Sequence, residues 1–145
     1  TEKAIKDGWL HTGDIGYFDN EYLKITDRKK DILITPGGDN ISPVKIENDL
    51  IKTEFIEQAL VYGDNKPFLV ALIVLSEDKK KVDYKVINEE IEKINNDLSK
   101  IEKIKKFIVI KNQFTIENGF MTPTLKLKRF KIIQKYKTQL EKLYN

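Results

Sequence analysis

The sequence predicts a small α+β domain, built as a sheet flanked by helices and preceded by a β-hairpin segment. Two observations support this prediction. The runs Gln58–Tyr62 and Phe68–Leu75 are short and apolar, as strands are, and the second is apolar on both faces like a central strand. Residues 84–106 carry apolar side chains at spacings of three and four, the period of a helix with one buried face. At 145 residues the chain has the length of one domain, with room for an appended hairpin.

The hairpin is predicted near the beginning of the chain. Residues 15–18 and 22–26 are two strand-like runs joined through an Asp-Asn pair, a common turn pattern. A charged connector at 27–31 follows and leads to a short apolar strand at 32–34. Because every residue of this connector is charged, we expect it to be solvated and place a boundary there.

Turn and cap residues mark the first helix. Residues 36–40, Pro-Gly-Gly-Asp-Asn, are the densest turn signal in the chain. Ser42 followed by Pro43 is typical of a helix start, because Ser caps free N–H groups and Pro suits the first turn. A helix is therefore predicted from there to about Lys52.

The last part of the chain is predicted to alternate helix, strand and helix. The helical pattern runs from Tyr84 to Lys106 and is followed by a strand at 107–110. After a polar loop at 112–124, an exposed amphipathic helix is predicted from Phe130 onward.

Composition excludes several classes of function. Cysteine is absent, which excludes disulfides, zinc–thiolate and iron–sulfur sites and a thiol nucleophile. His11 is the single histidine, so no His-rich metal site is expected, and His11 itself is assigned no role. The net charge of +3 is weak for a nucleic-acid binder, so no nucleic-acid partner is expected. No apolar run approaches the ~18 to 20 residues needed to span a bilayer.

Three local strings narrow the function. The first is Gly-Trp-Leu-His-Thr-Gly-Asp-Ile-Gly at 8–16. The second is Ile-Thr-Asp-Arg-Lys-Lys-Asp-Ile-Leu-Ile at 25–34, continued by Gly-Gly-Asp-Asn-Ile-Ser-Pro at 37–43. The third is Asn-Gly-Phe-Met-Thr-Pro-Thr-Leu-Lys-Leu-Lys-Arg at 118–129. In this order and spacing they resemble the C-terminal part of the AMP-forming acyl-CoA synthetases, and most closely the long-chain fatty-acid–CoA ligase branch of the adenylate-forming superfamily.

This resemblance implies a C-terminal lid domain that works with a larger N-terminal domain of the same protein. Residues 1–27 then form the end of the N-terminal domain, and residues 28–145 form the lid, which turns about a hinge at Asp27. The chain begins at Thr1 inside a motif, so we expect it to be a piece of a longer protein. The piece alone is expected to be inactive.

The resemblance also implies two nucleotide contacts. A carboxylate just after Thr-Gly can accept hydrogen bonds from both hydroxyls of a ribose, and this places Asp14 on the ribose of ATP. Arg28 resembles the family residue that reaches the ribose or phosphate, since a guanidinium fork matches oxyanions. General patterns alone allow a different interpretation, in which Asp14 caps a turn beside Gly13 and Arg28 is one solvated charge among several.

Lys126 is the implied catalytic residue. In adenylation a fatty-acid carboxylate attacks the α-phosphate of ATP and expels pyrophosphate, and an ammonium between the two anions offsets their repulsion. The family carries this lysine after Pro-Thr or Pro-Ser and two residues before a basic pair, which fits Lys126. Many relatives have Gly where this chain has Leu125, and Lys128 is the competing position.

Residues near the first helix are implied to serve the second half of the reaction. Gly37, Gly38 and Asn40 are placed on the path of CoA, although a tight turn before a helix explains them equally well. Glu47 resembles a recurrent family glutamate, and a purely structural role near the helix N-terminus fits it as well. No metal site is predicted in this piece.

The predicted function is ATP-dependent formation of an acyl-adenylate, followed by thioester formation with CoA after the lid rotates. Fatty acid, ATP and CoA are the small-molecule partners, and Mg²⁺ is expected to be held mainly by the N-terminal domain. Two alternatives stay open: an adenylating relative with another acid or acceptor, and a basic module that binds anionic surfaces. A cytoplasmic location is expected, with peripheral contact at the inner membrane face.

Overall fold

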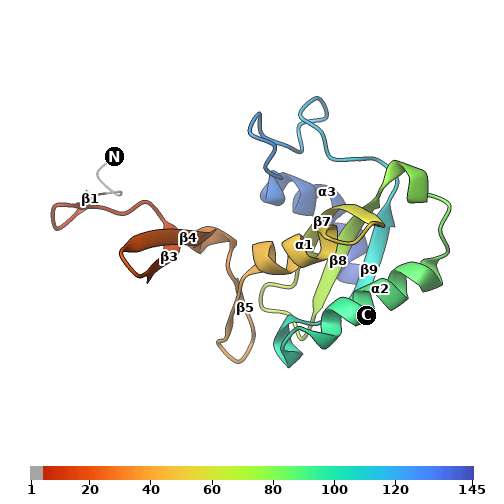
Figure 1. Ribbon diagram of the computed structural model, residues 1–145, viewed down its shortest axis with the longest axis horizontal. Helices are drawn as coiled ribbons and strands as arrows, with labels where there is room; N and C mark the ends of the chain where they lie inside the picture. Colours follow the sequence, from red (N-terminus) through yellow and green to blue (C-terminus); the bar gives the residue numbers. More distant parts are fainter. Residues whose placement is uncertain (1–4) are drawn as a thin grey trace.

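The computed structural model describes residues 5–145, apart from the side chains of Lys6, Thr26 and Asp27. It consists of an extended N-terminal arm and a body of helices and sheet (Figure 1). The arm contains β1 (Ile5–Lys6), β2 (Trp9–Leu10), β3 (Asp14–Asp19) and β4 (Tyr22–Arg28).

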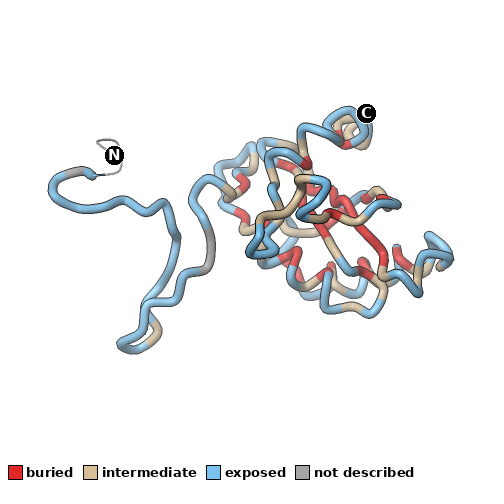
Figure 2. Tube along the Cα trace, turned by 90° about the horizontal axis from the view of Figure 1, so that it is seen from above, coloured by how far each residue is buried: buried red, intermediate tan, exposed pale blue. Residues whose placement is uncertain are grey.

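The predicted hairpin is confirmed as the antiparallel pair of β3 and β4. Its turn places Asn20 at φ 58°, a left-handed conformation that Asn tolerates better than most residues. The second strand is longer than predicted, because Asp27 and Arg28 belong to β4, where they pair with Ile15 and Asp14. The arm is exposed along most of its length and has no core of its own (Figure 2).

A short connector joins the arm to the body. It contains the 3₁₀ turn η1 (Lys29–Asp31) and the two-stranded pair β5 (Leu33–Ile34) and β6 (Asn40–Ile41). The Ile34 N–H donates to Asp64 Oδ1 at 3.0 Å, and the Asn65 N–H donates to the Ile34 carbonyl at 2.7 Å. These bonds fasten β5 to the loop that follows the first strand of the main sheet.

The body is built on a three-stranded sheet in the order β7 (Ile56–Tyr62), β8 (Leu69–Leu75), β9 (Ile104–Ile110). β7 and β8 are antiparallel, whereas β8 and β9 are parallel and are connected through α2 (Tyr84–Asn96). Every residue of β8 is buried, as predicted for a central strand.

Helices cover both faces of this sheet (Figure 1). On one face lie α1 (Pro43–Ile51) and α2, which bury Ile46 and Ile91 among other side chains. On the other face lies α3 (Arg129–Lys142). The predicted α+β class, a small sheet flanked by helices, is therefore confirmed.

Two predicted helices differ from the structure. The helix predicted to reach Lys106 ends at Asn96, because the buried Asn95 side chain bonds both the N–H and the carbonyl of Ile104 at 2.9 Å and turns the chain back. The turn η3 (Lys100–Glu102) follows, and β9 begins three residues before the predicted strand. The C-terminal helix, predicted to be exposed, buries Ile132 and Leu140 against the sheet.

Within residues 5–145, no helix combines the length and the apolar character needed to cross a bilayer.

Candidate functional site

A broad groove of about 1520 Å³ runs between the arm and the body. Its walls come from β3, β4, η1, α1, β7, the chain between β9 and α3, and the beginning of α3. Asp14, Arg28 and Lys126 all line this groove, although they lie far apart in the sequence. The fold thus brings together the predicted nucleotide contacts and the predicted catalytic lysine.

Lys126 is presented by a tight loop. Met121 and Leu127 pair as an antiparallel bridge at its base. The Thr122 N–H donates to the Lys126 carbonyl at 2.8 Å, and the Lys126 N–H donates back to Thr122 Oγ1 at 3.1 Å. The Lys126 side chain itself is exposed at the groove, so its ammonium is free to meet an anionic ligand.

The backbone conformation at Leu125 explains why many relatives have Gly at this position. Its φ of 63° lies in the left-handed region, which costs a non-glycine residue roughly 1–2 kcal/mol. We expect Leu125→Gly to raise the free energy of unfolding by about 0.5 to 1 kcal/mol, because relief of this strain exceeds the conformational entropy cost of glycine. Urea unfolding followed by circular dichroism measures the change.

Thr124→Gly is the matched control for this prediction. Thr124 lies in the same exposed loop without a positive φ, so glycine there adds flexibility, removes the 2.9 Å hydrogen bond between the Thr122 and Thr124 hydroxyls, and lowers stability. Equal loss of stability in both variants would show that the left-handed backbone at Leu125 carries no strain.

The two predicted nucleotide contacts are paired with each other. Arg28 Nε lies 2.8 Å from Asp14 Oδ1, across the β3–β4 ladder, and Arg28 Nη1 donates to the Thr12 carbonyl at 3.1 Å. The turn before β3 is capped by Thr12, whose Oγ1 accepts from the Asp14 N–H at 3.3 Å, rather than by the Asp14 side chain. Asp14 is therefore held in place by Arg28 while facing the groove.

A buried ion pair lies beside the Lys126 loop. Arg129 Nη2 donates to both carboxylate oxygens of Glu47, at 2.6 and 2.7 Å, and Arg129 Nη1 donates to the Val61 carbonyl at 3.1 Å. Glu47 Oε1 also accepts from the Val61 N–H at 2.7 Å. We call this set of contacts the Glu47–Arg129 clamp.

Burial has the largest effect on the pKa of Glu47. It raises the pKa of the Glu47 carboxyl above its ordinary value, while the Arg129 guanidinium and the Val61 N–H act in the opposite direction. The ionised form of Glu47 thus depends on Arg129 for its stability.

The remaining predicted residues are Asp27 and the glycine-rich turn before the first helix. Asp27 lies in β4 and pairs with Ile15, and since its side chain is outside the described part, its hinge role stays a prediction. Gly37 and Gly38 lie in the turn between β5 and β6, where Gly38 has a φ of 89°, and Asn40 is the first residue of β6. None of these three lines the groove.

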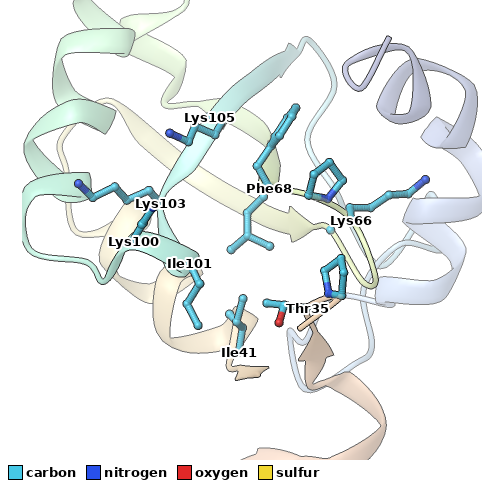
Figure 3. A pocket seen from close by; sticks show the side chains of 12 residues that line it. Thr35, Ile41, Lys66, Phe68, Lys100, Ile101, Lys103 and Lys105 are labelled. Carbon is cyan, nitrogen blue, oxygen red and sulfur yellow. The ribbon is translucent and has the colours of Figure 1, made fainter. Parts of the chain in front are cut away.

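The β5–β6 turn instead adjoins a second, smaller pocket of about 310 Å³. Apolar side chains such as Ile41, Phe68 and Ile101 occupy its middle, and the lysine side chains extend outward from them (Figure 3). Four lysines line this pocket: Lys66, Lys100, Lys103 and Lys105. Lys66 pairs with Glu141 at 2.7 Å, whereas the other three form no ion pair with another residue in the described range 5–145. This basic rim suits a ligand that carries several negative charges.

A comparison with protein families decides which fold family is present. The C-terminal domain of AMP-binding enzymes matches residues 30–145. This chain belongs to that family. The chain also matches curated proteins, among them several long-chain-fatty-acid–CoA ligases.

Two of these relatives indicate how much of an enzyme is present. The chain is 35% identical to the long-chain-fatty-acid–CoA ligase FadD15 of Mycobacterium tuberculosis, over 100% of this chain and 28% of that protein. It is 37% identical to the long-chain-fatty-acid–CoA ligase 5 of Mus musculus, over 99% of this chain and 24% of that protein. The C-terminal domain thus spans about a quarter of the length of these relatives.

Solved structures show the same fold. The adenylation domain of a carboxylate reductase from Mycobacterium chelonae superimposes with a TM-score of 0.89 at 26% identity, covering 99% of this chain and 24% of that one. The O-succinylbenzoate CoA synthetase of Bacillus subtilis, in complex with AMP, gives 0.67 at 30% identity, covering 90% and 25%. One of these enzymes is a carboxylate reductase and the other a CoA synthetase, so enzymes with different activities share this fold.

Sequence reasoning missed the partnership of Glu47 and Arg129 in this C-terminal domain. The two residues are 82 positions apart, and each was interpreted on its own, Glu47 near a helix start and Arg129 only as the end of the motif at 118–129. The available signal was a glutamate on the apolar side of a short helix, which burial would force to find a cation.

Proposed function

We propose that this domain is the lid of an AMP-forming ligase that activates a long-chain fatty acid and transfers it to CoA. The observation behind the proposal is the groove that Asp14, Arg28 and Lys126 all line. Membership of the AMP-binding C-terminal domain family and the names of the curated relatives support the reaction and the acid class.

In the first step, a carboxylate oxygen of the fatty acid attacks the α-phosphorus of ATP, and the bond to pyrophosphate breaks. The Asp14 carboxylate binds the ribose hydroxyls, and the neighbouring Arg28 guanidinium contacts the ribose or a phosphate. The Lys126 ammonium stands between the two anions and stabilises the negative charge that builds on the phosphoryl oxygens.

ATP brings Mg²⁺ to this reaction. Within the described residues 5–145, no group of three or more His, Asp or Glu side chains is arranged to hold a metal ion. On the family resemblance, we propose that the N-terminal domain of the full-length protein supplies most of the Mg²⁺ ligands.

In the second step, the lid turns about Asp27, the CoA thiol attacks the acyl carbonyl and AMP leaves. Gly37, Gly38 and Asn40 then lie on the CoA side. The adjacent pocket supports this assignment, because the phosphates of CoA match its unpaired lysines.

The test compares two variants of the full-length protein in steady-state assays with ATP, palmitate and CoA. Asp14→Asn should raise the KM for ATP by about tenfold, the cost of weakening a charged hydrogen bond, with the KM for CoA unchanged. Lys103→Ala should do the reverse and raise the KM for CoA about two- to fivefold, as expected for an exposed ion pair. If neither variant changes one KM without changing the other, the assignment of ATP to the groove and of CoA to the pocket is wrong.

An acid series decides between the favoured substrate and its alternative. Long-chain acids should give the highest kcat/KM, and a preference for an aromatic or short acid would identify an adenylating relative with another substrate. A chain that binds anionic vesicles in a strongly salt-dependent way, without any ATP-dependent activity, would instead be a surface-binding module.

A further inference from the structure

The Lys126 loop is held at its C-terminal side by one charged residue. Arg129 is the first residue of α3 and lies three positions after Lys126. Its guanidinium bonds Glu47 on α1 and the Val61 carbonyl on β7. Because α1 and α3 cover opposite faces of the sheet, the Glu47–Arg129 clamp joins the two helix layers around the sheet edge.

The backbone of β7 explains why charged partners are needed there. β7 is an edge strand, so its outward-facing N–H and carbonyl groups have no neighbouring strand to bond. At the fully buried Val61, Glu47 accepts from the N–H and Arg129 donates to the carbonyl. The clamp thereby satisfies this edge and fixes the Arg129 side chain in one place.

The far end of α3 has anchors of its own. Leu140 is fully buried against the sheet, and Glu141 pairs with Lys66 and accepts a hydrogen bond from Tyr62. Loss of the clamp would therefore loosen only the beginning of α3 and the loop before it.

We propose that Glu47 is a positioning residue for Lys126, which sets through Arg129 where the Lys126 ammonium stands in the groove. This inference rests on the adenylation role proposed for Lys126. The Lys128 N–H donates to the Phe120 carbonyl at 2.8 Å, so the loop between Phe120 and Arg129 is closed and moves with its anchor. A misplacement of about 1 Å at a reacting group costs about 100-fold in rate.

Glu47→Gln in the full-length protein tests the inference, because Gln keeps the shape and one acceptor but removes the charge. Acyl-adenylate formation from ATP and palmitate should slow about 10- to 100-fold. Thioester formation from pre-made palmitoyl-adenylate and CoA should keep its rate, because Lys126 is needed only in the first step.

Glu141→Gln is the matched control, since it makes the same chemical change at the other end of α3. It should leave the rate of adenylate formation unchanged. Hydrogen exchange gives a second measurement: Glu47→Gln should speed exchange in a peptide covering residues 120–131 and not in one covering 133–142. Glu141→Gln should produce the opposite pattern. If Glu47→Gln does not fold, Arg129→Lys replaces it, because Lys keeps the charge but loses the two-oxygen fork.

Two results would overturn the inference: equal loss in both half-reactions, or adenylate formation at the wild-type rate. Lys126→Ala, assayed in parallel with the Glu47 and Glu141 variants, distinguishes failure of the positioning role from failure of the proposed function. If Lys126→Ala abolishes adenylate formation while Glu47→Gln does not affect it, only the positioning role of Glu47 fails. If Lys126→Ala leaves adenylate formation intact, the catalytic role of Lys126 fails and the positioning role fails with it.

Discussion

Lys126→Ala in the full-length protein is expected to slow acyl-adenylate formation by about 100- to 1000-fold, the usual cost of removing one preorganised charge-stabilising group. The loop geometry gives the reason: hydrogen bonds to Thr122 hold the Lys126 backbone, so the loop presents the Lys126 side chain to the groove. Pre-steady-state measurement of pyrophosphate release from ATP and palmitate gives the rate.

Lys128→Ala is the control for this prediction, because Lys128 lines the same groove and carries the same charge. It should change adenylate formation only slightly. The opposite ranking of the two variants would move the catalytic role to Lys128. Thioester formation from pre-made palmitoyl-adenylate should survive in Lys126→Ala, and its equal loss would mean that Lys126 supports the fold rather than the chemistry.

Arg129→Met is expected to destabilise the domain by about 3–5 kcal/mol at neutral pH, because it leaves the buried Glu47 carboxylate without a counter-charge. Methionine keeps an apolar stem of similar length, so the loss comes mainly from the charge. Urea unfolding followed by circular dichroism measures it. Glu47→Gln in the Arg129→Met background should recover much of the loss, and failure to recover would assign the effect to packing.

The loss in Arg129→Met should also depend on pH, and its sign follows from burial. Burial already raises the folded-state pKa of Glu47 above its ordinary value of 4.5, and removal of Arg129 raises it further. An acid with a raised folded pKa contributes full stability below its unfolded pKa and loses it as pH rises through the folded pKa. The difference in the free energy of unfolding between Arg129→Met and the wild type should therefore become smaller as pH falls toward 4.5.

Much of the fold was predictable because its signals are local. The Asp-Asn turn, the Ser42–Pro43 helix start and the wholly apolar β8 each depend on a few adjacent residues. The end of α2 was not predictable, because the helical spacing of apolar residues continues past Asn95. The helix ends there because the Asn95 side chain forms hydrogen bonds with the backbone of Ile104. Local pattern cannot distinguish an isoleucine that continues a helix from one that begins the next strand.

The site divides in the same way. The motif that contains Lys126 indicated the loop, and the left-handed backbone at Leu125 explains why many relatives have Gly at that position. Asp14 pairs with Arg28 because the register of β3 and β4 places the two residues opposite each other. The predicted second strand ended before Arg28, so this pairing could not be inferred from it. Contacts across the sheet edge, such as those of Glu47 with Arg129, exist only once three layers have assembled.

The exposed arm has a practical consequence for studying this chain. Trp9 is its single tryptophan, and this residue is 76% exposed to solvent on the arm, away from the buried sheet. Intrinsic tryptophan fluorescence of this chain therefore reports on the arm and hardly on the body, and an unfolding curve followed at that emission would miss the melting of the core. The same insensitivity makes Trp9 a label-free docking probe: a blue shift of its emission would signal that another surface has covered the arm.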